Sequence, residues 1–271
     1  MSLLIVGSVA YDSIKTPFGE VDKVLGGSAL YSSLSASFYT DVNLVAVVGE
    51  DFPKSEIEYL NTKGINTDGL IVKEGKTFFW KGEYSYNLNE PKTLDTQLNV
   101  FADFKPTINE NFRDSEYVFL ANIDPDIQMH ILEQIRNPKF VALDTMNLWI
   151  ENKKDSLLKV INKVDALIIN EGEIRQLMKD YNILTAVNKL FDIAKDLKYL
   201  IIKRGEYGVL FFDRINQNKI FSLPSYPIEM VKDPTGAGDS FAGGFMGFLS
   251  KINDVNQKSL RKSVVIGTVM A

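Results

Sequence analysis

The stretch Asp233-Pro234-Thr235-Gly236-Ala237-Gly238-Asp239-Ser240-Phe241 decides how this chain can be interpreted. An apolar run rich in small residues, 242–250, follows it and predicts a helix. Pro234 disfavours helical backbone in the residue before it, so we expect the helix to begin after this proline. Gly236 and Gly238 allow the backbone to turn until successive N–H groups point outward together, at the positive end of the helix dipole. The stretch therefore predicts a binding site for an oxyanion.

Asp239 lies inside the same predicted anion site, where a carboxylate would repel the ligand unless it had a chemical role. A general base fits this position, because it would accept a proton from a hydroxyl while the amides hold the charge of a transferred phosphoryl group. The alternative is a glycine-rich cap on a tightly packed helix, with Gly243, Gly244 and Gly247 at close contacts. A cap needs one glycine or one aspartate, so the complete set of residues favours the catalytic interpretation.

This nonapeptide resembles the signature of the ribokinase-like (PfkB) family of carbohydrate and nucleoside kinases. The resemblance implies that Asp239 is the catalytic base and that the backbone of Gly236, Ala237, Gly238 and Asp239 forms the anion hole. It implies ATP and Mg²⁺ as cofactors and leaves a monovalent cation open as a third. It also implies a ribokinase-like fold, in which a small β lid is inserted into an α/β core and closes over the substrate.

The overall composition limits the classes of function. The chain has 271 residues, of which 45% are hydrophobic and 24% are charged, as in ordinary soluble globular proteins. Its net charge of −5 and the lack of a local basic patch argue against nucleic acid as a partner. The absence of cysteine excludes disulfides and thiolate metal sites, and no apolar run approaches the roughly 18 residues of a membrane helix. Without a signal peptide, we expect a cytoplasmic protein that binds small molecules.

From residue 117 onward, short apolar strands alternate with helical patterns. We expect strands over 117–121, 140–144, 166–170 and 199–203, and helices over 126–135, 155–163, 171–180 and 185–196. Earlier apolar runs predict further buried strands over 3–6 and 43–48, and a hairpin is expected over 208–213 and 219–223. Such alternation predicts an α/β fold within one domain, 1–271, with a mostly parallel central sheet and helices on both faces.

Two early segments, approximately 11–26 and 70–100, lack this alternation and look like exposed hairpins. By the resemblance, these segments form the lid. Aromatic residues on one face of the second segment either contact the substrate or form a hydrophobic seam: Phe78, Trp80, Tyr84 and Tyr86. The seam would attach the lid to the core or build a homodimer through it.

The sequence stops at Ala271 inside an apolar helical pattern. Members of the family usually continue with at least one more helix. We therefore expect the C-terminal end of the domain to be incomplete here, together with part of the wall of the nucleotide pocket.

Asn170 and Glu173 lie three positions apart, at the end of a predicted strand and the start of a predicted helix. They resemble the family's Asn-x-x-Glu element, which organises water-bound magnesium and the nucleotide phosphates. Magnesium keeps several waters, so an amide and an acid at this spacing suit an indirect role, with no direct protein ligand. The alternative is helix capping, in which Asn170 is the N-cap and Glu173 completes a capping box.

Lys203, Gly205 and Gly208 follow the end of another buried strand, where α/β sheets place their ligands. They resemble the family's Lys-x-Gly-x-x-Gly stretch. The glycines would let the backbone approach the nucleotide, and Lys203 would neutralise phosphate charge. The alternative is a plain turn from a strand into a hairpin. Weaker site candidates lie at or just after the ends of other predicted strands: Asp144, Asn147 and Asn122.

Gly26, Gly27 and Ser28 open a predicted helix and resemble the family's first signature, the glycine pair that lines the acceptor pocket. Tyr31 stands where many sugar kinases of the family place an asparagine that fixes sugar hydroxyls, so the identity of the acceptor stays open. Asp12 follows the first strand, where family members often hold an acid against substrate hydroxyls. The alternative for Asp12 is a solvated loop charge.

Several other motifs fail. Gly75-Lys76-Thr77 looks like the end of a Walker A loop, but the glycine that the loop needs earlier is replaced by Leu70. No Gly-x-Gly-x-x-Gly follows the first strand, which argues against a dinucleotide-binding enzyme. A nucleophile elbow around Ser240 fails because Ala242 occupies the position of its last glycine. His130, the single histidine, is assigned a structural role, so no transition-metal site is expected.

Together these motifs predict an ATP-dependent kinase that transfers the γ-phosphate to a hydroxyl of a sugar or polyol. A nucleoside kinase of the same family is the alternative, with the same machinery and a flatter, more aromatic acceptor pocket. A catalytically silent, sugar-binding member is the alternative from another class, but binding alone would not need Asp239 as a base. We expect a neutral acceptor, because the segments 8–31 and 77–86 contain no arginine and only three lysines.

Overall fold

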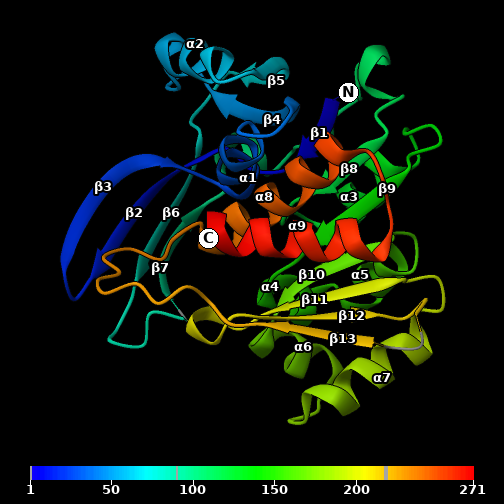
Figure 1. The fold of residues 1–271 in the computed structure, drawn as a ribbon. Helices are drawn as coiled ribbons and strands as arrows, with labels where there is room; N and C mark the ends of the chain where they lie inside the picture. The colour runs from blue at the N-terminus through cyan, green and yellow to red at the C-terminus, as the bar shows by residue number, and fades with distance from the viewer. Residues whose placement is uncertain (1, 90, 217–218) are drawn as a thin grey trace.

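The computed structural model describes residues 2–89, 91–216 and 219–271, which form two sheets and the helices around them (Figure 1). Within these ranges, the large sheet has nine strands in the order β13-β12-β11-β10-β9-β8-β1-β4-β5. The small sheet has four strands in the order β3-β2-β6-β7.

The strands of the large sheet are β1 (Ser2–Val6), β4 (Asp41–Gly49), β5 (Ile65–Lys73), β8 (Tyr117–Leu120), β9 (Phe140–Asp144), β10 (Ala166–Asn170), β11 (Tyr199–Lys203), β12 (Val209–Asp213) and β13 (Lys219–Leu223). Those of the small sheet are β2 (Ala10–Thr16), β3 (Gly19–Gly26), β6 (Phe78–Glu83) and β7 (Lys92–Gln97). The helices are α1 (Ser28–Ala36), α2 (Lys54–Thr62), α3 (Pro125–Leu132), α4 (Asn147–Asn152), α5 (Lys154–Ile161), α6 (Glu171–Met178), α7 (Ile183–Ile193), α8 (Ala237–Ile252) and α9 (Gln257–Met270).

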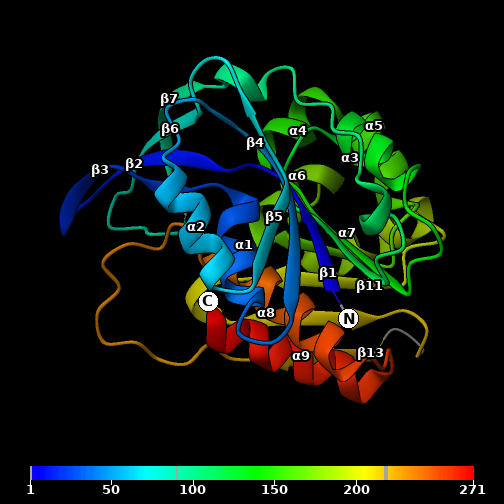
Figure 2. The ribbon, with the colours of Figure 1, turned by 90° about the horizontal axis from the view of Figure 1, so that it is seen from above.

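The large sheet is parallel from β5 to β11, and the two remaining pairs, β11–β12 and β12–β13, are antiparallel. Its central strands are apolar along their length because both faces of a parallel sheet are covered by helices. In β10, Leu167 and Ile169 belong to the core on the side of α3–α7, whereas Ala166 and Ile168 belong to the core on the side of α1, α2, α8 and α9. Figure 2 shows the two helical layers on opposite sides of the sheet. The predicted mostly parallel sheet with helices on both faces is confirmed. No helix in the described ranges is long and apolar enough to cross a bilayer.

The small sheet projects from one side of the molecule (Figure 1) and is built from residues 10–26 and 78–97. Residues 65–73 do not belong to it, because they form β5 and pair with β4 in the large sheet. The second segment of the small sheet therefore begins near residue 78, later than the sequence-based boundary of 70.

The aromatic residues of the small sheet have different surroundings. Phe78 stacks on Phe101 of the main core, with ring centroids 5.4 Å apart, and so attaches the sheet to the core. Tyr84 is buried, whereas Tyr86 is exposed. Other apolar side chains of the sheet are exposed, among them Phe18, and the expected homodimer through this sheet stays a prediction.

Helix α1 fixes the start of α8 through its serines. The Ser32 hydroxyl donates to the carbonyl oxygen of Asp239 at 3.1 Å, and the Ser35 hydroxyl donates to that of Ser240 at 2.6 Å. The helices approach so closely that a Cβ at Gly243 would collide with the Ser32 carbonyl oxygen. The close-contact role considered for the glycines of this helix is therefore present alongside any catalytic role of Asp239.

We predict that Gly243→Ala destabilises the protein. Alanine gains about 1 kcal/mol of helix propensity, but the clash is with backbone that cannot rotate away, and overpacking costs about 1–3 kcal/mol. We therefore expect a lower free energy of unfolding in urea. Glu58→Ala is the control, because it also places alanine in a helix, at an exposed position of α2. An equal or higher stability of the Gly243 variant would contradict the close packing.

Candidate active site

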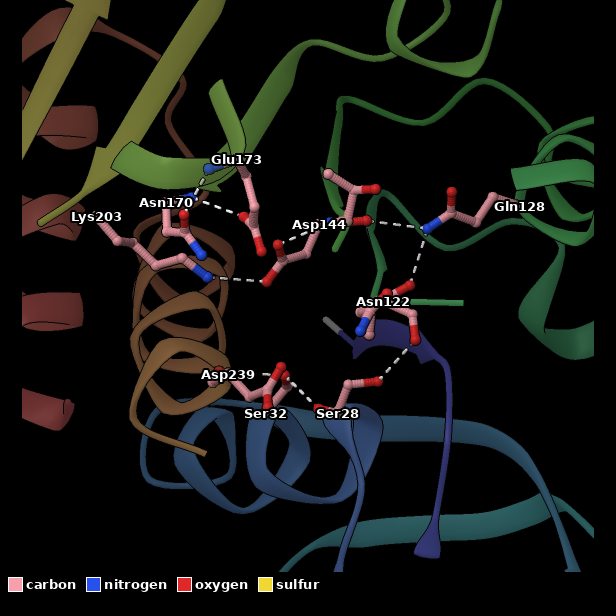
Figure 3. Close-up of polar contacts among 11 residues, drawn as sticks. Ser28, Ser32, Asn122, Gln128, Asp144, Asn170, Glu173, Lys203 and Asp239 are labelled. Carbon is pink, nitrogen blue, oxygen red and sulfur yellow. Dashed lines mark hydrogen bonds and ion pairs between the residues drawn. The ribbon is translucent and has the colours of Figure 1, made fainter. Parts of the chain in front are cut away.

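Four ionisable side chains meet where parallel strands of the large sheet end (Figure 3). Asp144 ends β9 and Lys203 ends β11, while Glu173 lies in the first turn of α6, directly after β10. Asp239 enters from the first turn of α8. The Lys203 Nζ donates to Asp144 Oδ2 at 3.1 Å. The carboxyl ends of parallel strands thus bring together residues that are far apart in the sequence.

Lys203 holds a charge among three acids. Burial alone would lower the pKa of Lys203, yet the carboxylates of Asp144, Glu173 and Asp239 raise it above its ordinary value. Burial raises the pKa of Asp144, and the ammonium of Lys203 partly offsets that effect. We infer that Lys203 stays protonated across the physiological range and stabilises the acids around it.

Asp239 has the electrostatics of a base. Burial raises its pKa to about 7, with Asp144 and Asp12 adding to the rise and Lys203 opposing it. A carboxyl group with this pKa is present in both protonation states near neutral pH, which is the condition under which general bases work best. Perturbed values of this kind often occur at functional sites.

Asn170 and Glu173 form a complete capping box at the start of α6. The Glu173 amide donates to Asn170 Oδ1 at 2.8 Å, and the Asn170 amide donates to Glu173 Oε2 at 2.9 Å. The capping alternative is therefore present in the structure. The box also holds the Glu173 carboxylate beside Lys203, where burial raises its pKa to about 7. Capping and a role at the site are compatible, because the same contact orients the acid.

The N-terminus of α8 points into the same space. Gly236 precedes it in the left-handed region, with φ of 76°, and within the described residues no side chain caps the helix. The Ala237 amide donates to the Pro234 carbonyl at 3.1 Å, whereas the amides of Gly238 and Asp239 have no hydrogen-bond partner among the described residues. A Cβ at Gly238 would lie 2.9 Å from Lys203 Nζ. Two amides and one ammonium thus converge on a space suited to an oxyanion.

The predicted acceptor residues cluster around Asp12 of β2. Its side chain is buried, and burial raises its pKa to about 7, although a hydrogen bond from Gly27 opposes the shift. A Cβ at Gly26 would collide with this carboxylate, so the glycine makes room for it. Gly27 has φ of 99°, a conformation that favours glycine. Ser28 is also buried, and its hydroxyl donates to the Asn122 carbonyl at 3.2 Å.

Tyr31 lies between the acceptor side and α8. Its ring is so close to Gly236 that a Cβ there would be 2.5 Å from Cγ of the tyrosine. Burial raises the pKa of the Tyr31 hydroxyl, and the carboxylates of Asp12, Asp233 and Asp239 raise it further. The structure therefore brings the expected acceptor residues and the candidate base to one region.

The remaining candidates lie in different settings. Gly205 and Gly208 form the turn after β11, and both have positive φ. Asn147 is exposed and accepts a hydrogen bond from the neighbouring Leu148 amide, so nothing in the structure directs it toward the acids. The Asn122 side chain accepts from the Trp149 indole at 3.0 Å.

Sequence reasoning did not assign a site role to three hydrogen bonds that shape this region. The hydroxyls of Ser32 and Ser35 hold the first turn of α8, and the hydroxyl of Tyr84 accepts a hydrogen bond from Thr235 at 3.2 Å. The serines lie at helical spacing in α1, which marks a polar stripe but not its partner. Tyr84 follows the end of a strand, and no local pattern connects it with the Thr235 region.

Comparison with known proteins assigns the family: the family description that matches residues 3–271 is "pfkB family carbohydrate kinase". The chain belongs to the pfkB family. A cytidine kinase of Thermococcus kodakarensis is 29% identical over 263 residues, which cover 93% of this chain and 89% of that protein. The nucleoside kinase of Methanocaldococcus jannaschii has the same fold, with a TM-score of 0.76, 20% identity, and coverage of 98% of this chain and 89% of that one.

A second solved structure of the same fold is a putative ribokinase II of E. coli in complex with ATP and Mg²⁺. Its TM-score is 0.77 at 18% identity, with coverage of 98% of this chain and 91% of that one. The expected pfkB family, the ribokinase-like fold and the class of phosphotransferase acting on an alcohol group are thereby confirmed.

We predict that Asp239→Asn makes this pfkB-family protein more stable at alkaline pH. The folded pKa of Asp239 is raised to about 7 from an ordinary 3.8, so the group opposes folding where it is ionised. This penalty is absent below the unfolded pKa, grows between the two values and is complete above the folded pKa. The Tm of the variant relative to the parent should therefore rise from pH 5.5 to pH 8.

Asp192→Asn serves as the control for that measurement, because Asp192 is exposed on α7. A difference in Tm that stays constant with pH for Asp239→Asn would show that the Asp239 carboxylate is not destabilised by its surroundings.

Proposed function

We propose that this pfkB-family chain transfers the γ-phosphoryl group of ATP to a hydroxyl of a neutral sugar or polyol, with Asp239 as the general base. One observation carries the proposal. A carboxyl group with a pKa of about 7 lies in the first turn of an uncapped helix, in the charge environment of Lys203. A binding protein gains nothing from that arrangement, since the carboxylate repels an anion unless it takes up a proton during the reaction.

In the proposed reaction, the Asp239 carboxylate accepts the proton of the acceptor hydroxyl. The hydroxyl oxygen then bonds to the γ-phosphorus while the bond from that phosphorus to the β-phosphate oxygen breaks. The amides of Gly238 and Asp239 donate to the transferring oxygens, and Lys203 neutralises their charge. Both amides lack a protein partner in the described structure, which supports their assignment to the anion hole.

The residues at the strand ends also fit a nucleotide with magnesium. Among the described residues, no group of three or more His, Cys, Asp or Glu side chains could hold a metal ion. Asp144 instead offers a buried carboxylate and Glu173 a half-buried one near Lys203, which suits hydrogen bonding to metal-bound water. When bound, Mg²⁺ would neutralise charge on the phosphates. The related fold that holds ATP and Mg²⁺ supports this assignment.

We predict that Asp239→Asn lowers kcat by about 10²–10⁴-fold, because general-base catalysis contributes that much. Binding of an ATP analogue, measured by calorimetry, should stay near the parent value. In the parent enzyme kcat should fall as pH drops below about 7, since protonated Asp239 cannot accept a proton.

The control for this measurement is again Asp192→Asn, which should keep the parent kcat. A kcat above about a tenth of the parent value in the Asp239 variant would exclude Asp239 as the base.

The acceptor side argues for a neutral substrate. Its three lysines are placed away from an anion-binding role. Lys15 pairs with Glu83 at 2.8 Å, Lys81 lies 4.0 Å from Glu20, and Lys23 is exposed. Asp12, which lies among the candidate acceptor residues, would repel an anionic acceptor. Hydroxyl groups, in contrast, can donate to this carboxylate.

Nucleosides are the second candidate class of acceptor. The cytidine kinase and nucleoside kinase to which this chain is similar favour that class. The half-buried Tyr31 supports it, because its ring lies near Asp12 and Asp239 and is of the kind on which a base can stack.

We predict that the acceptor is uncharged, whether sugar, polyol or nucleoside. A coupled ADP-release assay over neutral sugars, polyols, nucleosides, sugar acids and phosphosugars should give the highest kcat/KM for a neutral compound. A phosphosugar or sugar acid turned over about tenfold more efficiently than any neutral compound would contradict the assignment of Asp12 and the paired lysines.

A further inference from the structure

The turn from Asp233 to Gly236, which leads into α8, is contacted by two other parts of the fold. The ring of Tyr31, which belongs to α1, packs against Gly236. From the small sheet, the Tyr84 hydroxyl accepts a hydrogen bond from Thr235 Oγ1 at 3.2 Å. Within the turn, the Thr235 amide donates to Asp233 Oδ1 at 2.9 Å. The backbone that sets the direction of the Gly238 and Asp239 amides is thus held by two tyrosines from different parts of the fold.

Tyr84 is well placed to transmit the position of the small sheet. It directly follows β6, and its amide donates to the Lys15 carbonyl of β2 at 2.8 Å. Its side chain is buried, with 7% exposure. Asp12 lies on β2 and pairs with Trp80 of β6 across the sheet. A movement of Asp12 with its sheet would therefore carry Tyr84 with it.

The two tyrosines also lie around the space between the acceptor side and the base. The carboxylates of Asp12, Asp233 and Asp239 each raise the pKa of Tyr31 and of Tyr84, although burial is the larger cause for both. All three acids are therefore near both hydroxyls. An acceptor held between Asp12 and Asp239 would occupy the region that Tyr84 borders.

We propose that Tyr84 is a positioning residue that holds the Thr235 turn and thereby aims the Gly238 and Asp239 amides when the small sheet is in place. Loss of the hydrogen bond removes the contact of the turn with the small sheet and leaves its contacts with Tyr31 and within the turn. With the hydrogen bond intact, the anion hole is assembled together with the small sheet, which carries the candidate acceptor carboxylate. Phosphoryl transfer to water is disfavoured when the sheet is displaced, because the amides are no longer aimed. This inference rests on the proposed function for its catalytic consequence, but its structural part does not.

The structural part is tested by amide hydrogen exchange of the peptide covering 233–241, without any substrate. Tyr84→Phe and Thr235→Val each remove the hydrogen bond, and each should speed exchange in this peptide about fivefold, the effect of one ordinary hydrogen bond. Thr235→Ser keeps the hydroxyl and should exchange as the parent does. The double variant Tyr84→Phe/Thr235→Val should be no faster than either single variant, because both remove the same contact.

Tyr86→Phe is the matched control, since Tyr86 follows the same strand but is 86% exposed. It should leave exchange and turnover unchanged. Parent-like exchange in Tyr84→Phe, or effects of the two single variants that simply add, would overturn the positioning role. A variant that unfolds would show faster exchange along the whole chain, so exchange in β10 and β11 is recorded with it and should not change.

The catalytic part is tested with the best acceptor from the ADP-release assay. Tyr84→Phe and Thr235→Val should lower kcat about fivefold with little change in KM for ATP, and Thr235→Ser should restore the parent kcat. A change in KM for ATP alone, with kcat intact, would contradict this part. If exchange changes as predicted while the parent turns over no acceptor, the proposed function fails and the positioning of the turn stands.

Discussion

One largely buried ammonium group, that of Lys203, makes the arrangement at the edge of the large sheet possible. Asp144, Glu173 and Asp239 converge there, and three ionised carboxylates in a partly dry space would repel one another strongly. Lys203 lies among them and pairs with Asp144. Its positive charge offsets part of the negative charge of the three acids. Without the lysine, the acids would take up protons and Asp239 would lose its capacity to act as a base at neutral pH.

The position of that base depends in turn on how α8 docks. The helix is placed by glycines against α1 and by serine hydroxyls bonded to its first carbonyl groups. Carbonyl groups in the first turn already bond within the helix, so the serines add a second contact without using the free amides. The donors at the helix start therefore stay available for an oxyanion. The same docking that stabilises the fold thus leaves the reactive end of the helix open.

Much of this could be predicted from the sequence, because local signals coincide with the functional groups. The apolar strands ended at the residues that carry the site, and the Gly-Ala-Gly-Asp stretch marked the helix start with Asp239 in its first turn. Residues 70–73 were assigned to the wrong sheet, since an extended apolar segment does not reveal its pairing partner. The Ala237 amide donates to the Pro234 carbonyl and is not free for a ligand. The sequence could not predict this, because it depends on the geometry of the turn. The contact of Tyr84 with Thr235 joins positions 151 residues apart and left no pattern in either segment.

The chemical groups of the proposed site are divided between the two sheets in a way that bears on how such enzymes diverge. The proposed base, the free amides and the lysine belong to the large sheet and its helices, whereas Asp12 belongs to the small sheet. Substitutions in the small sheet can therefore exchange one alcohol for another while the machinery that handles phosphate is inherited unchanged. Tyr84 is the exception. It directly follows a strand of the small sheet, but its hydroxyl bonds to the turn that leads into α8. A substitution at this position would therefore affect both the acceptor side and the anion hole.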